Sequence, residues 1–194
     1  IKLDYTNYTL EFYTTKFGEA YDMKNICHEY LKGLQWVINY YRNGMPDWRW
    51  YYPFFYAPFL KELSEHTLDF GETVNSKQTG GLIFEERFPV PSFLQLLSVM
   101  PPSCCNLLPD PLGNIIGSDF NNYYPTKFYI DCSGKRNEWE GIVNLPFINV
   151  DNLEKEYNKL IDNVSEKDRK RNNKNSSIVL QYTSNPKITL FKSF

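Results

Sequence analysis

The pattern of apolar and polar residues in the first part of the chain predicts one long helix. Between residues 22 and 43 apolar side chains recur at helical spacing, at Leu31, Leu34, Ile38 and Tyr41. The pair Asn43-Gly44 is expected to end this helix. Residues 1–20 mix polar and aromatic residues and fit either a strand or a helix.

The second half of the chain predicts three shorter helices. Residues 91–100 form the first, with Phe93, Leu96, Leu97 and Met100 on one side and two prolines after it. Asp151 is expected to cap the next helix, whose apolar face is Leu153, Tyr157, Leu160 and Ile161. Ser165 and Asp168 have capping-box spacing and predict a third. Residues 103–126 are rich in loop formers, and residues 128–131 and 142–145 fit short strands or extended links.

Residues 48–59 contain eight aromatic side chains in twelve positions. They follow neither the period of a strand nor that of a helix, and Pro53 and Pro58 exclude a regular element. We therefore expect an irregular segment anchored by its rings. Residues 69–81 predict a polar loop.

Composition describes an ordinary folded chain. Of 194 residues, 42% are hydrophobic and 23% charged, and the net charge is −2. These values exclude overall disorder and a nucleic-acid interaction based on bulk charge. No apolar run reaches the roughly 18 residues of a membrane span, so no membrane partner is expected. The first residue is not Met, and we expect the chain to begin inside a longer protein.

Several common chemistries have no support in the sequence. Four scattered cysteines without C-x-x-C spacing favour free thiols in a reducing, intracellular compartment over zinc or disulfides. Neither His28 nor His66 has a nucleophile motif beside it, and Gly80-Gly81 is no phosphate loop. The basic run over residues 167–174 is interpreted as a solvated helix end, with an RNA phosphate contact as the less favoured alternative.

Several longer motifs occur in order along residues 21–172. They are Glu29-Tyr30-Leu31-Lys32-Gly33-Leu34-Gln35-Trp36-Val37, Tyr40-Tyr41, Trp48-Arg49-Trp50-Tyr51-Tyr52-Pro53, Tyr56-Ala57-Pro58-Phe59, Gln95-Leu96-Leu97-Ser98-Val99-Met100-Pro101, Asn106-Leu107-Leu108-Pro109, Tyr124-Pro125, Asp131 with Gly134-Lys135, Trp139, Leu145-Pro146-Phe147-Ile148 and the segment from Glu166 to Asn172. Together they resemble the Xrn/Rat family of 5′→3′ exoribonucleases. The sequence departs from the family pattern at Phe55, at residues 118–122 and at Ser133. The matching region is the second of two conserved blocks in the family's enzyme core.

The resemblance implies a processive nuclease that degrades single-stranded RNA with a 5′-monophosphate, using Mg²⁺. Two-metal hydrolysis needs several converging carboxylates. In the family these belong to an N-terminal block that this sequence lacks, which makes that block the expected partner. We therefore assign no catalytic or metal-binding residue here, and we expect the isolated fragment to be inactive. The pair Glu138 and Glu140 is interpreted as surface or packing residues.

The resulting fold class is α+β, mainly helical with long irregular connections, as the C-terminal part of a larger nuclease core. Residues 1–172 are assigned to the conserved block and residues 173–194 to an Asn-rich linker and C-terminal extension. Aromatic surfaces are expected to face the N-terminal block. The alternative function is a non-catalytic RNA-binding or scaffolding module. The sequence Gly33-Leu34-Gln35-Trp36 favours a cytoplasmic over a nuclear member of the family.

Trp48, Arg49 and Trp50 are the candidate substrate-binding residues. A processive nuclease must hold RNA of any sequence, and stacking on an aromatic face suits that need. In the family a Trp from this block is thought to stack near the 5′ end of the RNA. We expect one of the two Trp residues to stack and the other to pack, with Trp48 as the stacking residue; the alternative is that both are core residues.

Overall fold

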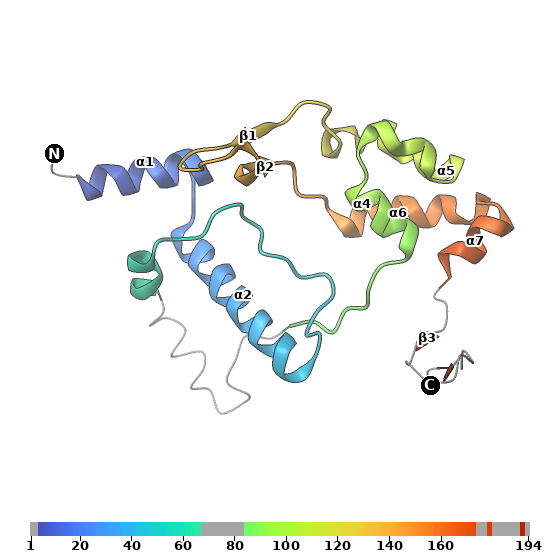
Figure 1. Ribbon diagram of the computed structural model, residues 1–194, viewed down its shortest axis with the longest axis horizontal. Coiled ribbons are helices and arrows are strands. Elements are labelled where there is room, and N and C mark those ends of the chain that lie inside the picture. The colour runs from blue at the N-terminus through green and yellow to red at the C-terminus, as the bar shows by residue number, and fades with distance from the viewer. Residues whose placement is uncertain (1–3, 67–83, 174–177, 180–190, 193–194) are drawn as a thin grey trace, which may run out of the picture. The chain divides into compact units, whose positions relative to one another are not determined.

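The computed structural model describes residues 4–66, 84–173, 178–179 and 191–192, and the chain divides into two compact units. Unit 1 comprises residues 1–89 and 129–144, and unit 2 comprises residues 90–128 and 145–194. The predicted polar loop at 69–81 and most of the predicted linker at 173–194 lie outside the described residues. The described chain is mainly helical with short two-stranded sheets, as expected (Figure 1).

Unit 1 begins with two helices that end in glycine. Helix α1 spans Tyr5–Phe17, which decides between the two readings of the first twenty residues, and α2 spans Met23–Asn43. Asp4 and Asp22 cap them by accepting hydrogen bonds from backbone N–H groups three residues on. Gly44 follows α2 with a φ of 94°, which a residue with a side chain rarely adopts. The predicted helix end at Asn43-Gly44 is therefore confirmed.

Residues 48–59 form no regular element, as predicted, and a helix over residues 60–66 follows them. The Phe59 amide donates to the Tyr13 hydroxyl at 2.7 Å and ties this segment to α1. Rings of Phe12, Tyr13 and Phe59 also contact one another. This segment has no regular backbone hydrogen bonds of a helix or sheet, so its aromatic side chains hold it against α1 instead.

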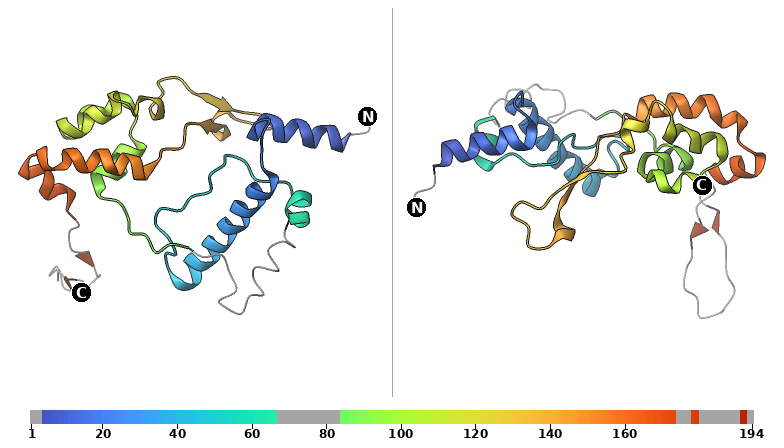
Figure 2. Two further views of the ribbon diagram at one scale, coloured as in Figure 1. Left: turned by 180° about the vertical axis from the view of Figure 1, so that it is seen from behind. Right: turned by 90° about the horizontal axis from the view of Figure 1, so that it is seen from above.

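A β-hairpin completes unit 1. Strands β1 (Tyr129–Asp131) and β2 (Ile142–Asn144) pair antiparallel, with Ile130 opposite Val143. The loop between them carries the 3-10 helix η4 (Glu138–Glu140) and extends beyond the strands (Figure 2). Gly141 has no room for a side chain, because a Cβ there would lie 2.5 Å from the Ile130 side chain and 2.9 Å from the Cys132 sulfur. The strand alternative for these two segments is confirmed.

Unit 2 is built around one apolar core. Its helices are α4 (Ser92–Val99), α5 (Asp110–Gly113), α6 (Val150–Leu160) and α7 (Glu166–Asn172), which lie together in Figure 1. Short 3-10 helices fill the predicted loop-rich region: η1 (Pro102–Leu107), η2 (Asn114–Gly117) and η3 (Asn121–Tyr123), and η5 (Ile161–Asn163) follows α6. The fully buried members of the core are Leu94, Leu97, Leu112 and Leu153.

Two details of the predicted helices were wrong. The cap of α6 is Asn149, which accepts from the Asn152 amide at 2.9 Å, so Asp151 lies inside the first turn. On α4, Leu94 rather than Leu96 faces the core, since Leu94 is 0% and Leu96 39% exposed. The predicted Ser165 cap of α7 is confirmed, because its side chain accepts from the Asp168 amide at 3.2 Å.

At the C-terminal end, strands β3 (Ile178–Val179) and β4 (Phe191–Lys192) pair antiparallel. Among the described residues, no helix has both the length and the apolar character needed to cross a membrane.

The orientation of α4 gives a direct stability test. Leu94→Ala removes a fully buried side chain and leaves a cavity, so the free energy of unfolding should fall by about 2–5 kcal/mol. Leu96→Ala, two residues away on the same helix, is the matched control and should cost less than about 1 kcal/mol. Urea denaturation followed by circular dichroism measures both, and equal losses would contradict the orientation described.

Candidate functional site

The aromatic segment after α2 is held in place by the buried carboxylate of Asp47. Asp47 accepts from the Arg49 amide at 2.8 Å and from the Arg87 side chain at 2.7 and 3.2 Å. Burial alone would raise the pKa of Asp47, but the hydrogen bonds from Arg87 and from the Arg49 amide outweigh it and lower the pKa. The segment therefore leaves the helix in one fixed direction.

Trp50 packs against α2. Its ring lies 3.1 Å from the position that a Cβ on Gly33 would occupy, and its indole N–H donates to Glu29 at 3.2 Å. It also makes an edge contact with Phe84. The absence of a side chain at Gly33 is what allows the indole to lie this close to the helix.

Trp48 is 56% exposed, two residues before the packed Trp50. Between them the Arg49 Nε donates to the Phe88 carbonyl at 3.3 Å, so this guanidinium already has a protein partner. The three residues predicted as substrate-binding thus have different surroundings: Trp48 points a large apolar surface to solvent, Trp50 packs on the helix, and Arg49 contacts the chain.

Helix α2 also exposes apolar side chains. Leu34, Val37, Ile38 and Tyr41, which include most of the periodic face expected from sequence, are all exposed. The buried residues of α2 are Ile26 and Cys27, near its start.

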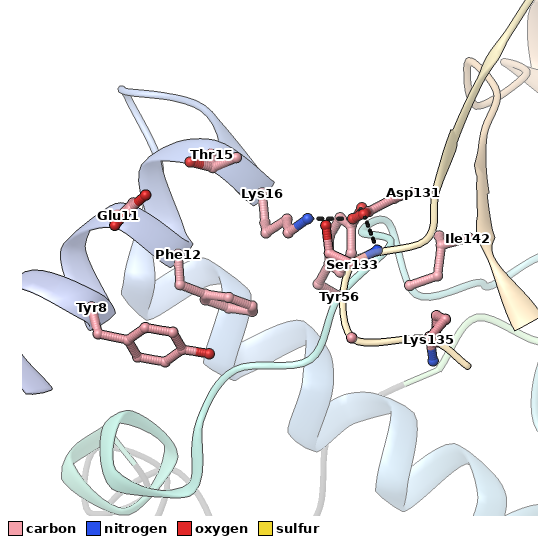
Figure 3. Close-up of a pocket in the computed structure, with 11 residues that line it drawn as sticks. Tyr8, Glu11, Phe12, Thr15, Lys16, Tyr56, Asp131, Ser133, Lys135 and Ile142 are labelled. Carbon is pink, nitrogen blue, oxygen red and sulfur yellow. Dashed lines mark hydrogen bonds and ion pairs between the residues drawn. The ribbon is translucent and has the colours of Figure 1, made fainter. Parts of the chain in front are cut away.

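A second feature of unit 1 is a pocket of about 520 Å³ between α1 and the hairpin (Figure 3). It is lined by Tyr8, Glu11, Phe12, Thr15 and Lys16 of α1, by Tyr56, and by Asp131, Ser133, Gly134, Lys135 and Ile142 of the hairpin. This volume lies within the range of small-molecule sites.

Asp131 is the structural centre of this pocket. It is 3% exposed, forms an ion pair with Lys16, and accepts from the Tyr56 hydroxyl at 2.6 Å and the Ser133 amide at 2.9 Å. The hydrogen bond from Lys16, followed by those from Tyr56 and Ser133, holds the pKa of Asp131 well below its usual range. The same hydrogen bond raises the pKa of Lys16. Both groups are therefore charged at neutral pH.

Lys16 is the residue that sequence analysis missed. Asp131 belongs to a family-like motif, but nothing in the sequence links it to a lysine 115 positions earlier. Only an alignment in which the two positions change together would have provided that signal.

The described part of the chain does not form a metal site. Among residues 4–66 and 84–173, no three His, Cys, Asp or Glu side chains come together closely enough to hold a metal ion. Glu138 lies on the exposed 3-10 helix of the hairpin loop. The Mg²⁺ implied by the resemblance therefore does not fit any site made by these residues.

The basic helix α7 is partly neutralised by its own acidic residues. Lys170 pairs with Glu166 at 2.9 Å and Arg171 pairs with Asp168. Arg171 also lies over the Phe93 ring, and Asn172 accepts from the Phe93 amide at 2.9 Å. These contacts give α7 a role in holding α4, within unit 2.

Comparison with known proteins places the whole chain in one family. A family model described as the Xrn1 helical domain matches residues 1–194. Similar proteins include 5′-3′ exoribonuclease 2 of Schizosaccharomyces pombe, 32% identical over 92% of the chain, and that of Yarrowia lipolytica, 33% identical over 90%. Human 5′-3′ exoribonuclease 1 is 30% identical over 92% of the chain. The chain spans 18%, 17% and 10% of these relatives, respectively.

The Asp131–Lys16 pair predicts acid sensitivity. A carboxyl whose pKa is lower in the folded state than its ordinary 3.8 stabilises the fold above that value. This stabilisation is progressively lost as the pH falls below about 4. Asp131→Asn should cost about 3 kcal/mol at pH 7, because it leaves Lys16 without its counter-charge. It should also flatten the dependence of stability on pH below 4.

Thermal unfolding between pH 2.5 and 7 measures both effects. The matched control is Asp119→Asn, since the Asp119 side chain is exposed. A steep acid slope that persists in Asp131→Asn would show that other carboxyls carry it.

Proposed function

The chain belongs to the Xrn family of 5′→3′ exoribonucleases, and we propose that its unit 1 binds single-stranded RNA for such an enzyme. The observation that carries the proposal is the exposed indole of Trp48 beside the packed indole of Trp50. An exposed indole presents a flat aromatic face to solvent, and RNA bases stack on such faces.

Stacking suits an enzyme that must move along RNA of any sequence. Each base has a π-face, so a ring contributes about 1–3 kcal/mol per base without reading the sequence. Asp47 supports this role, because its hydrogen bonds to the Arg49 amide and to Arg87 fix the backbone on both sides of Trp48. Because the backbone that carries Trp48 is held by these bonds, little backbone entropy is lost when a base stacks on the ring.

The reaction proposed for the whole enzyme is stepwise hydrolysis of 5′-monophosphorylated RNA with Mg²⁺. The metal would be held by carboxylates of another block of the same protein, since the described residues of this chain do not bring such a set together. This chain's part is to position the RNA and to support that block.

The exposed apolar face of α2 is the proposed contact with that nuclease block. Leu34, Val37, Ile38 and Tyr41 form a strip that a neighbouring part of the protein would remove from water. An intracellular location is proposed with it, because the four cysteines are free thiols. The preference for the cytoplasm over the nucleus rests on the sequence of residues 33–36.

Single tryptophan variants of the protein at its full natural length test the stacking role. Trp48→Ala should weaken the binding of a single-stranded RNA by roughly 5- to 100-fold, the loss expected for one stacking contact. Its melting temperature should stay close to that of the parent, because Trp48 is exposed. Trp50→Ala should instead lower the melting temperature, because its indole packs on Gly33.

The matched control is Trp139→Ala, since Trp139 is 82% exposed but lies in the hairpin loop. Fluorescence anisotropy in EDTA gives RNA affinity without degradation. If Trp48→Ala and Trp139→Ala bind RNA alike, the stacking assignment is wrong.

The proposed reaction is tested separately by decay of RNA with a 5′-monophosphate. The full-length protein should degrade this RNA with Mg²⁺ and release mononucleotides from the 5′ end. RNA with a 5′-hydroxyl is the control substrate. Equal decay of both RNAs would contradict the preference for a 5′-monophosphate. Decay of neither would favour the non-catalytic RNA-binding alternative.

A further inference from the structure

We propose that the pocket between α1 and the β-hairpin binds a nucleotide: an aromatic base next to Tyr8 and a phosphate next to Lys135. The pocket is separate from the Trp48 segment, because none of residues 47–50 lines it. Nucleotide binding there does not require the exoribonuclease activity proposed above.

The base side of the pocket is a stripe along one face of α1. Tyr8, Glu11, Phe12, Thr15 and Lys16 follow helical spacing, so they line the pocket together. Tyr8 stacks on Phe59 with its ring 7° from parallel, which fixes the ring orientation. In Figure 3 the rings of Tyr8 and Phe12 lie side by side and point toward the hairpin loop. This arrangement provides a pre-oriented aromatic surface for a planar ring.

The charges of the pocket separate into a cancelled pair and two remaining groups. Lys16 and Asp131 neutralise each other, and Tyr56 donates to the same carboxylate. Lys135 and Glu11 remain, on opposite sides of the pocket in Figure 3. Lys135 can bind an anion, and Glu11 can accept from an amino group.

The loop beside Lys135 leaves its backbone open. Gly134 has a φ of 71°, and no atom lies within 4 Å of the position of a Cβ there. Asp131 fixes this loop through the Ser133 amide, and the Lys135 amide donates to the Cys132 carbonyl at 2.9 Å. A rigid turn with glycine at its tip allows a bulky phosphate to approach the main chain.

These features together select the class of ligand. An inorganic phosphate would leave the aromatic stripe unused, and a purely apolar ligand would cover Lys135 and Glu11 without giving them partners. A divalent cation has no cluster of ligating side chains in the described residues. A nucleotide matches all three parts of the pocket. Its base can stack on the aromatic rings, its phosphate can bind Lys135, and the amino group of adenine or cytosine can donate to Glu11.

The nucleotide has two possible sources, a free mononucleotide or one unit of an RNA chain. Photo-crosslinking of the full-length protein distinguishes them, using 8-azidoadenosine 5′-monophosphate in one arm and, in the other, an RNA ten-mer that carries 8-azidoadenosine, with EDTA. Peptide mapping by mass spectrometry should find label on residues 5–17 or 131–142. Label from the mononucleotide supports a free nucleotide as ligand, and label from the RNA alone supports a unit of the chain.

Variants of two lining residues test the assignment. Lys135→Ala and Tyr8→Leu should each reduce labelling of these peptides by at least about five-fold, as expected for one charged hydrogen bond or one stacking ring. The matched controls Lys127→Ala and Tyr5→Leu remove an exposed lysine and an exposed tyrosine that do not line the pocket, and they should leave labelling unchanged. Circular dichroism checks that each variant is folded.

The proposal is overturned if neither probe labels these peptides, or if Lys135→Ala labels like Lys127→Ala. Trp48→Ala should not change mononucleotide labelling of the pocket. The pocket and the stacking role of Trp48 can therefore fail independently.

Discussion

The carboxylate of Asp131 receives hydrogen bonds from three separate stretches of unit 1, and the arrangement of that unit depends on them. Lys16 comes from α1, Tyr56 from the irregular aromatic segment, and the Ser133 amide from the hairpin loop. A buried carboxylate without these donors would be costly, so each segment is held where it satisfies the charge. The pocket between α1 and the hairpin is a consequence of this arrangement.

Unit 1 uses the same device twice. Asp47 and Asp131 each accept from the backbone N–H two residues later, and each pairs with a basic side chain from a distant part of unit 1, Arg87 or Lys16. The local bond makes a turn, and the distant one fixes where that turn lies. This explains how long irregular segments can present Trp48 and Lys135 in defined positions without a large sheet. The apolar core of unit 2, in contrast, needs no buried ion pair among its members.

Local signals in the sequence predicted most of the helices, but not which of their side chains are buried. The length of α2, the Gly44 stop and the Ser165 cap depend on neighbouring residues, and the structure has all three. On α4, apolar residues occur on several sides, so only the surrounding core decides that Leu94 is buried and Leu96 is not. At α6, both Asn149 and Asp151 are residue types that can cap, and in the structure Asn149 has the extended backbone of a cap while Asp151 lies in the first turn. The Lys16–Asp131 contact has no local signal, so the pocket could not be predicted from the sequence.

The separation of Lys16 and Asp131 in the chain also affects synthesis of the protein. At about 5–20 residues per second, the ribosome needs on the order of ten seconds to make the 115 positions between them. During this time residues 90–128, which belong to unit 2, are made before the hairpin of unit 1 exists. Until the hairpin is made, α1 and the aromatic segment have part of their apolar surface exposed. During this time chaperones that bind such surfaces would have access to them.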